Sequence, residues 1–524
     1  MTTPKHLSAT GLAASLLTGL LAVALLAPAS GGTPPEPETL PDTEAAAAVG
    51  WPPAAPTQLV IDTQGQPIGR DDYIEGSVTL DGVTHTTEVR GRGNSTWSWA
   101  KKPYKLNLED DAALVGKRKH DEWVLLAGYG DRSALRTAAA FAIAAQTRLA
   151  WTPKYRFVDV VLNGQPQGLY MLTEQVEEGK GRVDLPDDGF LLEVNRRYLR
   201  DDEPGFRTKH GTPVAFKDPD EVTKRQRRSV RGAVSRFEKV LYGGMFAHPK
   251  RGYAAYINVS RFIDWYLVEE LFSNQDSNFQ SSVNFSWVPG KRLVFGPVWD
   301  FDLSAGTKWK STSSPESWYT RTGQHWVSRM LEDPSFSRRV KNRWAELRPA
   351  VEQVVSQLPA ASATLGASAE ADWQQWHAGG ADLDWTRRAA SRDGEVAFLQ
   401  DWLTRRTQWL SRNEVRLADA RVRTNEKDQT VWVPVVLHAT SAAAVDVSWS
   451  VIARTAEAGV DFVPATGTVT FQPGERRHYI PVQILDDKVK EGRELVQVDV
   501  TGASGDVVLG SPATGVVAIA ANKR

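Results

Sequence analysis

Hydrophobic and polar residues alternate along most of the chain between residues 58 and 195, which is the pattern of half-buried β-strands. From Gln58 the segments LVIDT, YIEGSVTLDG and THTTEVRG predict antiparallel strands joined by glycine turns. The segment KKPYKLNL continues the alternation, and Asn163-Gly164 predicts a hairpin between YRFVDVVL and GLYMLTEQV. GFLLEVN predicts one more strand, and its Glu193 needs a cationic partner if it is buried.

A longer apolar period predicts helices in five regions, at residues 131–149, 224–241, 259–274, about 323–358 and 384–419. Asp131 or Ser133 is the candidate N-cap of the first helix, and Ser260 is the candidate N-cap of the third. The last two helices are rich in Trp and Arg and are expected to form a packing lobe. After Ala420 the pattern becomes all-β, with strands at the spacing of a sandwich.

The segment 274–306, called the central segment below, carries the most conspicuous chemistry. VNFSW and RLVFGPVW predict two strands separated by Pro289-Gly290, and Asp276, Asp300 and Asp302 lie at their ends. Such a group of carboxylates is costly unless a cation neutralises it. Three interpretations remain open from spacing alone. The acids bind a metal–nucleotide complex with Asp276 as a proton acceptor, they form an acid/base pair of a glycosidase, or they bind a structural calcium ion or face solvent.

A candidate phosphate-binding region lies upstream, in RGRGNSTW followed by KKPYKLNL. Bare glycine N–H groups can approach a phosphate, and guanidinium and ammonium groups can offset its charge. A tight turn with surface basic residues is the alternative.

The N-terminus predicts export. An apolar run at residues 11–26 follows Lys5 and ends before Ala27-Pro28-Ala29, the small-x-small form of a signal-peptidase site. We therefore expect a signal peptide at 1–29, a disordered linker at 30–57 and a secreted protein with no membrane span after cleavage. An uncleaved anchor is the alternative interpretation of the apolar run.

Composition narrows the chemistry further. The 524 residues carry a formal net charge of −1 and give no global field that would attract nucleic acid. The chain has no cysteine, which excludes disulfides, thiol nucleophiles and Cys-ligated metal centres. Any metal should be hard and oxygen-bound.

In this order, the motifs RGRGNSTW, KKPYKLNL, GLYMLTEQVE, GFLLEVN and GPVWDFDLSAG resemble the CotH kinase family. The resemblance covers about residues 58–415 and implies a mixed α/β (α+β), two-lobed, atypical protein-kinase-like domain at 58–420, which uses ATP and Mg²⁺ or Mn²⁺. By position, it implies Asp276 as the catalytic acid that receives the hydroxyl proton. The implied metal ligands are Asp300, Asp302 and Asn284, with Asn278 as the alternative amide. The implied nucleotide-binding residues are Arg92, Lys102, Lys105 and Glu174. Lys105 is the better candidate for the phosphates because its neighbours alternate around it, whereas Lys102 precedes Pro103 and is expected in the loop. Glu174 is expected to pair with Lys105, with Glu193 as runner-up.

Residues 421–524 resemble a Calx-β repeat, a β-sandwich that often binds calcium. Acidic residues occupy positions at which acids cluster in that family, and oxygen ligands in loops suit Ca²⁺. The positions are Glu426, Asp461, Asp486, Asp487 and Glu491.

Together these observations predict a secreted, monomeric kinase that transfers the γ-phosphate of ATP to a Ser/Thr hydroxyl of another extracytoplasmic protein. The alternatives are a non-catalytic surface or matrix protein with an adhesive sandwich, and a glycosidase.

Overall fold

The computed structural model describes residues 49–199, 203–307, 314–323, 325–378, 383, 386–486, 489 and 491–521. The predicted signal peptide and most of the predicted linker lie outside these residues. Within the described part of the chain, no helix has both the length and the hydrophobicity of a membrane span.

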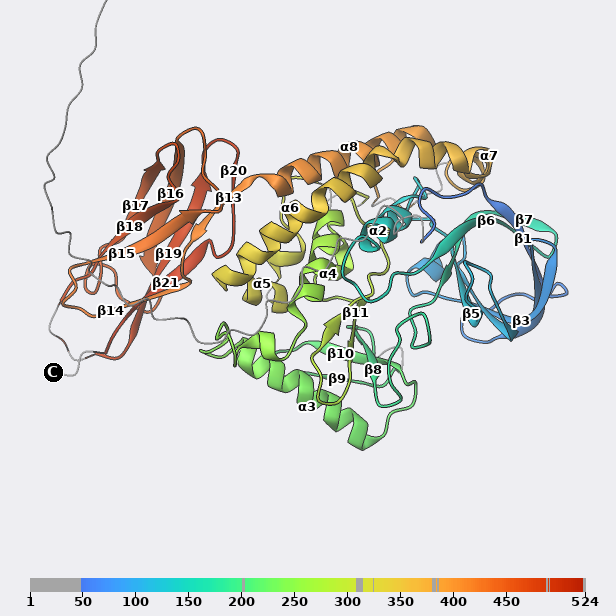
Figure 1. Cartoon of the computed structure of the whole chain (residues 1–524), viewed down its shortest axis with the longest axis horizontal. Helices are drawn as coiled ribbons and strands as arrows, with labels where there is room; N and C mark the ends of the chain where they lie inside the picture. Colours follow the sequence, from blue (N-terminus) through green and yellow to red (C-terminus); the bar gives the residue numbers. More distant parts are fainter. Residues whose placement is uncertain are drawn as a thin grey trace, which may run out of the picture. The chain divides into compact units, whose positions relative to one another are not determined.

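The first seven strands close into a barrel in the order β1-β2-β3-β4-β5-β7-β6 (Figure 1). Neighbouring strands are antiparallel except at the closure, where β1 runs parallel to β6. Alternate residues fill the interior, among them Leu59, Leu106 and the fully buried Trp123. The strands are β1 (Thr57–Asp62), β2 (Ile74–Leu80), β3 (Val83–Gly91), β4 (Tyr104–Ala112), β5 (His120–Leu126), β6 (Tyr155–Leu162) and β7 (Gln165–Glu174).

The Asn163-Gly164 hairpin is confirmed. It joins β6 and β7, which pair in antiparallel register, and both turn residues have positive φ, 49° and 74°. Asn and Gly are the residues that adopt this conformation most readily, which is why the pair predicts the turn so well.

A second sheet has the order β12-β11-β8-β10-β9 and packs with the helices around a separate core. Its strands are β8 (Phe190–Val194), β9 (Gly205–Arg207), β10 (Pro213–Asp218), β11 (Val283–Trp287) and β12 (Val294–Phe295). Only two residues of the predicted strand RLVFGPVW are in a strand. The strand ends before Gly296, whose φ is 106°, and Pro297, which has no N–H for a ladder hydrogen bond.

The helices are α2 (Arg136–Ala144), α3 (Lys224–Leu241), α4 (Val259–Phe272), α5 (Trp326–Leu331), α6 (Pro334–Ser356), α7 (Leu358–Trp376) and α8 (Arg392–Ser411). The prediction for 224–241 is confirmed to the residue. The helix predicted at 323–358 is two helices, because Asp333 caps a new helix that has Pro334 at its first position. Helix α4 is capped by Asn258, which accepts the N–H of Arg261, and not by Ser260 as predicted.

Helix α7 was not predicted, and the predicted first helix is shorter than expected. Asp131 lies before α2, and its carboxylate accepts the N–H of Arg136, the first residue of the helix, at 2.7 Å. The ion pair between Asp131 and Arg136 is buried, with 2.6 Å between Oδ1 and Nη1.

The C-terminal residues form two sheets, β18-β15-β13-β20 and β14-β21-β19-β16-β17, around their own valine-rich core (Figure 1). The predicted β-sandwich is thus confirmed. Its first strand, β13, precedes the predicted boundary at 420/421. The strands are β13 (Asn413–Leu417), β14 (Arg421–Thr424), β15 (Thr430–Leu437), β16 (Val445–Ala453), β17 (Ala465–Phe471), β18 (Arg477–Gln483), β19 (Glu494–Ala503), β20 (Val507–Leu509) and β21 (Thr514–Ile519).

Candidate active site

A cavity of about 550 Å³ is lined by the barrel, the second sheet, the central segment and helix α7. This volume is within the range of small-molecule and cofactor sites. The barrel contributes Arg92 and Lys105, and the central segment contributes Asp276, Asp300 and Asp302. Residues more than 200 positions apart in the sequence thus line one space.

The three aspartates come from two short connections. Asp276 lies in the 3₁₀ turn η3 (Gln275–Ser277) directly after α4, and its N–H donates to the side chain of Asn274 at 3.3 Å. Asp300 and Asp302 follow β12 and share a side-chain hydrogen bond. Asp300 has a φ of 67°, in the left-handed region.

Burial raises the pKa of all three carboxyl groups, and their mutual repulsion adds to this effect for Asp276 and Asp302. Burial and then the charge of Asp300 raise the pKa of Asp276 to about 7. Burial raises the pKa of Asp300, while the guanidinium of Arg92 opposes the shift. The pKa of Asp302 is well above its ordinary value because of burial and the charges of Asp300 and Asp131. Ionisation of all three carboxyl groups is therefore unfavourable with only the cations that the protein supplies.

The cationic side of the cavity comes from the barrel. Arg92 directly follows β3, and its guanidinium lies 5.8 Å from the ring centroid of Trp299. Lys105 is in β4, opposite Arg90 on β3 and opposite Val124 on β5. Its ammonium is 2.5 Å from Oε1 of Glu122, also on β5.

The structure pairs Lys105 with Glu122 and not with Glu174, which corrects the sequence-based assignment. Glu174 lies opposite Trp123, the residue beside Val124 on β5. Successive side chains of a strand point to opposite faces, so Glu174 and Lys105 are on opposite sides of the sheet. Glu174 instead accepts the N–H of Lys154 at 2.8 Å.

The runner-up, Glu193, does line the cavity but pairs with Lys217 on β10, at 3.5 Å between Oε2 and Nζ. It also accepts the N–H of Ser282 at 2.6 Å. The expectation that an acid in this apolar strand needs a cation is confirmed, although the cation is not Lys105.

Lys102 lies in the loop before β4, as expected from its place before Pro103. Its ammonium donates to the backbone carbonyls of Trp97 and Trp99, at 2.7 and 2.6 Å. It does not line the cavity among the described residues. Its charge therefore stabilises the loop before β4 and is not directed toward a ligand.

Asn284 lies in β11, opposite Glu193, and lines the cavity. Its amide nitrogen is 3.3 Å from the carbonyl oxygen of Ser282 and 3.4 Å from that of Pro297. Asn278, the alternative amide, does not line the cavity within the described ranges. Ser281 lines it and hydrogen-bonds to Asp276.

Sequence reasoning missed three contributors: Glu122, Lys217 and Arg197. Lys217 is recognisable afterwards as a charge inside the apolar strand PVAFKD, the same signal that identified Glu193. Glu122 is a polar residue on a half-exposed strand, and only the register of β4 against β5 brings it to Lys105.

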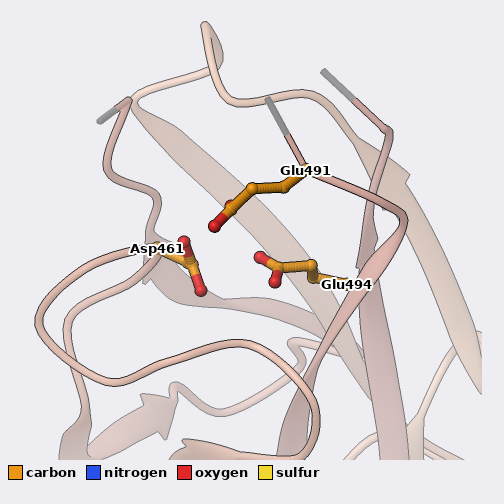
Figure 2. A group of neighbouring side chains, drawn as sticks. All are labelled: Asp461, Glu491 and Glu494. Carbon is orange, nitrogen blue, oxygen red and sulfur yellow. The ribbon is translucent and has the colours of Figure 1, made fainter. Parts of the chain in front are cut away.

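A second acidic group lies in the C-terminal sandwich (Figure 2). Oxygen atoms of Asp461, Glu491 and Glu494 are all within 4.8 Å of one another. Burial and a hydrogen bond that protonated Glu494 donates to Asp461 raise the pKa of Glu494 to about 7, and the charge of Glu426 acts in the same direction. Glu494 was not predicted.

Of the remaining predicted calcium ligands, Asp486 is not in this group of described residues, and Asp487 lies outside the described residues.

Comparison with known proteins identifies both regions. The family model described as CotH kinase protein matches residues 89–410, and the model described as Calx-beta domain matches residues 411–522. A stretch of 82 residues is 34% identical to Adhesion G-protein coupled receptor V1 of Danio rerio and covers 16% of this chain. The match spans only 1% of that receptor's length.

Among solved structures, the apo-form Calx CBD1 domain matches with 24% identity over 21% of this chain and 99% of its own, at a TM-score of 0.21. CBD12 from CALX1.2 matches with 25% identity over 20% of this chain and 44% of its own, at a TM-score of 0.20. Because the first family model covers more than half of the chain, the protein belongs to the CotH kinase family, and a Calx-beta domain follows its kinase-like region.

Proposed function

We propose that this protein is a secreted kinase that transfers the γ-phosphate of ATP to a Ser/Thr hydroxyl of an extracytoplasmic protein. The observation that carries the proposal is the meeting of Asp276, Asp300 and Asp302 with Arg92 and Lys105 in one cavity. Phosphoryl transfer needs positioning and neutralisation of charge more than covalent chemistry, and this set of side chains supplies both.

Asp276 is the residue that receives the proton of the acceptor hydroxyl. Its pKa of about 7 suits this role, because a general base works best when its pKa is near the working pH. Burial and the charge of Asp300 give it this value, and Ser281 acts in the opposite direction by hydrogen bonding to the carboxylate.

The residues around Asp300 fit a divalent cation. Asp300 and Asp302 are two buried carboxyl groups joined by a hydrogen bond, with raised pKa values, and Asn284 lines the same cavity. Oxygen donors of this kind suit Mg²⁺ or Mn²⁺. Once bound there, the ion would neutralise part of the negative charge of the ATP phosphates.

Arg92 and Lys105 bind the phosphates from the barrel side. Glu122 holds the Lys105 ammonium at 2.5 Å and so fixes its direction. This pair has the role that we had expected of Lys105 and Glu174.

Export through the N-terminal 29 residues, an acceptor on another secreted protein and a monomeric kinase are parts of the same proposal. The apolar run followed by Ala27-Pro28-Ala29 supports export. A chain with a net charge of −1 gives no reason to expect nucleic acid as a partner.

The test measures binding of ADP with Mg²⁺ or Mn²⁺ by calorimetry, and transfer of labelled phosphate from ATP to secreted proteins and to casein. We expect wild type to bind and label, Asp276→Asn to bind without labelling, and Asp300→Asn to lose metal-dependent binding. An Arg231→Met control changes an exposed helix residue outside the cavity and should behave as wild type.

Failure of wild type to bind nucleotide or to label any protein would leave the non-catalytic surface protein as the better explanation. Turnover of a glycan without nucleotide would favour the glycosidase instead.

A second function, calcium binding by the C-terminal domain, is favoured by the group of Asp461, Glu491 and Glu494 (Figure 2). The three carboxylates repel one another when ionised, and the pKa of Glu494 is raised in part for this reason. A bound Ca²⁺ would remove this repulsion. Calorimetric titration of the full chain with Ca²⁺, with Asp300→Asn to exclude binding in the kinase-like cavity, tests it.

A further inference from the structure

Arg197 is a cavity residue that the proposed function does not use. It follows β8 and lines the cavity together with the three aspartates. Among the residues that the structure describes, its guanidinium has neither a hydrogen bond nor an ion pair. The other cations from this sheet and from β4 are held, since Lys217 pairs with Glu193 and Lys105 with Glu122. Arg197 therefore offers the cavity a guanidinium whose donors are still available.

The backbone at Arg197 is fixed relative to Asp276. The N–H of Arg197 donates to Oδ1 of Asn195 at 2.8 Å. The N–H of the preceding residue, Arg196, donates to the carbonyl of Gln280 at 2.9 Å, and the N–H of Gln280 donates to the carbonyl of Asp276 at 3.1 Å. Arg197 thus projects from a segment tied by two successive backbone hydrogen bonds to the turn that carries Asp276.

The charge of Arg197 acts on Asp276 and on Asp300. It opposes the effect of burial on the pKa of both carboxyl groups, yet it forms no ion pair within 4 Å with either one. The guanidinium therefore acts on both acids from the same cavity without being paired to either. Its donors are available to an anionic group that binds beside the proposed base and the proposed metal ligand.

Arg92 and Arg197 act on different pairs of acids. Arg92 comes from the barrel, and its charge interacts with Asp300 and Asp302. Arg197 comes from the second sheet, and its charge reaches Asp276 and Asp300. Arg197 is thus the guanidinium on the side of the cavity where the acceptor hydroxyl would approach Asp276.

We infer that Arg197 contacts the phosphoryl group while it moves from ATP to the acceptor, an inference that rests on the proposed kinase function. In this step the acceptor oxygen forms a bond to the γ-phosphorus, and the bond from that phosphorus to the β–γ bridging oxygen breaks. The electron pair of the broken bond stays on ADP, and the hydroxyl proton goes to Asp276. Negative charge spreads over the equatorial phosphoryl oxygens, and the planar guanidinium has paired donors that match them.

The experiment compares the affinity of the full chain for ADP·Mg²⁺ with its affinity for ADP·Mg²⁺ plus aluminium fluoride, a mimic of the transferring phosphoryl group. We expect wild type to bind the aluminium fluoride complex more tightly than ADP·Mg²⁺ alone. Arg197→Met should abolish this gain, leave the affinity for ADP·Mg²⁺ within about twofold, and lower the labelling rate on the order of 10³-fold.

Arg197→Lys should recover only a small part of the rate, because an ammonium lacks the planar pair of donors. Arg231→Met, which removes an exposed arginine outside the cavity, should retain both affinities and the rate. Thermal unfolding of each variant checks that the fold is intact.

Three results would overturn the inference. An equal change in both affinities would make Arg197 a counter-ion of the carboxylates only. Slower labelling with the aluminium fluoride gain retained would make it an acceptor-recognition residue. If wild type bound no ADP·Mg²⁺, the kinase proposal would fail as well, whereas the first two results leave that proposal intact.

Discussion

The ammonium of Lys101 and the carboxylate of Asp372 form a buried ion pair, with 2.6 Å between Nζ and Oδ1. Both groups also bind Leu169 on β7, because Lys101 donates to its carbonyl at 2.5 Å and Asp372 accepts its N–H at 2.8 Å. Gly168 leaves room for this contact, since a Cβ there would lie 2.1 Å from Oδ1 of Asp372. The pair thereby fixes helix α7, one wall of the cavity, to the barrel.

Removal of one partner of this ion pair should lower the stability of the fold. Asp372→Ala leaves the Lys101 charge buried, and burial already lowers the pKa of that ammonium. We expect a loss of about 3 kcal/mol in the free energy of unfolding, measured by urea titration. The double variant Lys101→Met with Asp372→Leu should recover most of it, because no buried charge is left unpaired. A loss below about 1 kcal/mol for Asp372→Ala would show that α7 does not depend on the pair.

Lys102 and Lys105 of the segment KKPYKL should differ in their effects on nucleotide binding. Lys105→Met should weaken the affinity for ADP·Mg²⁺ at least about tenfold, because it removes a cation from the phosphate side of the cavity. Lys102→Met is the matched control and should leave that affinity unchanged, since its ammonium is held by backbone carbonyls of Trp97 and Trp99. Calorimetry measures both, and equal losses would contradict the assignment.

His325 should make stability depend on pH in mildly acidic solution. Its Nδ1 accepts the N–H of Val327 at 3.2 Å, and burial lowers its pKa from 6.5 to about 4. The unfolded chain therefore binds a proton that the folded chain does not. The contribution of His325 is complete above pH 6.5 and decreases as the pH falls toward 4, by roughly 3 kcal/mol in total.

His325→Asn isolates this effect, because an Asn side chain can still cap α5 but does not titrate in this range. The free energy of unfolding of the variant should fall less than that of wild type between pH 7 and pH 4. Parallel curves would mean that His325 is not the titrating group.

Calcium should stabilise the C-terminal domain through its acidic group. Saturation at about 100 times the dissociation constant adds about 2.7 kcal/mol, and addition of a chelator should remove it. Glu494→Gln should lose most of the calcium-dependent shift in unfolding temperature. Glu475→Gln changes an acid in the turn between β17 and β18, outside this group, and should keep the shift.

Several elements were predictable because their cause is local. The Asn163-Gly164 turn, helix α3 and the strand alternation around Lys105 depend on residues near one another in sequence, and all three are confirmed. Helix α7 was missed because its Ala- and Ser-rich first half, interrupted by the non-helical Gly366, has no clear apolar period.

The acidic residues that line the cavity could be predicted from the sequence, whereas the partners of its charged side chains could not. Asp276, Asp300 and Asp302 are adjacent to strong motifs, and the structure brings them to one cavity with Arg92 and Lys105. The partners of Lys105 and Glu193 depend on which strand lies beside which, and on a register that no local pattern specifies.

The left-handed backbone at Asp300 restricts how this site can change during evolution. Most side chains are strained at a φ of 67°, whereas Asn and Gly adopt it readily. Both are single-nucleotide neighbours of Asp in the genetic code. A substitution of Asp300 that spares the fold is therefore also one that removes its charge. This route would turn a kinase into a folded, inactive relative in a single step, while replacement by a larger or β-branched residue would be penalised for stability as well.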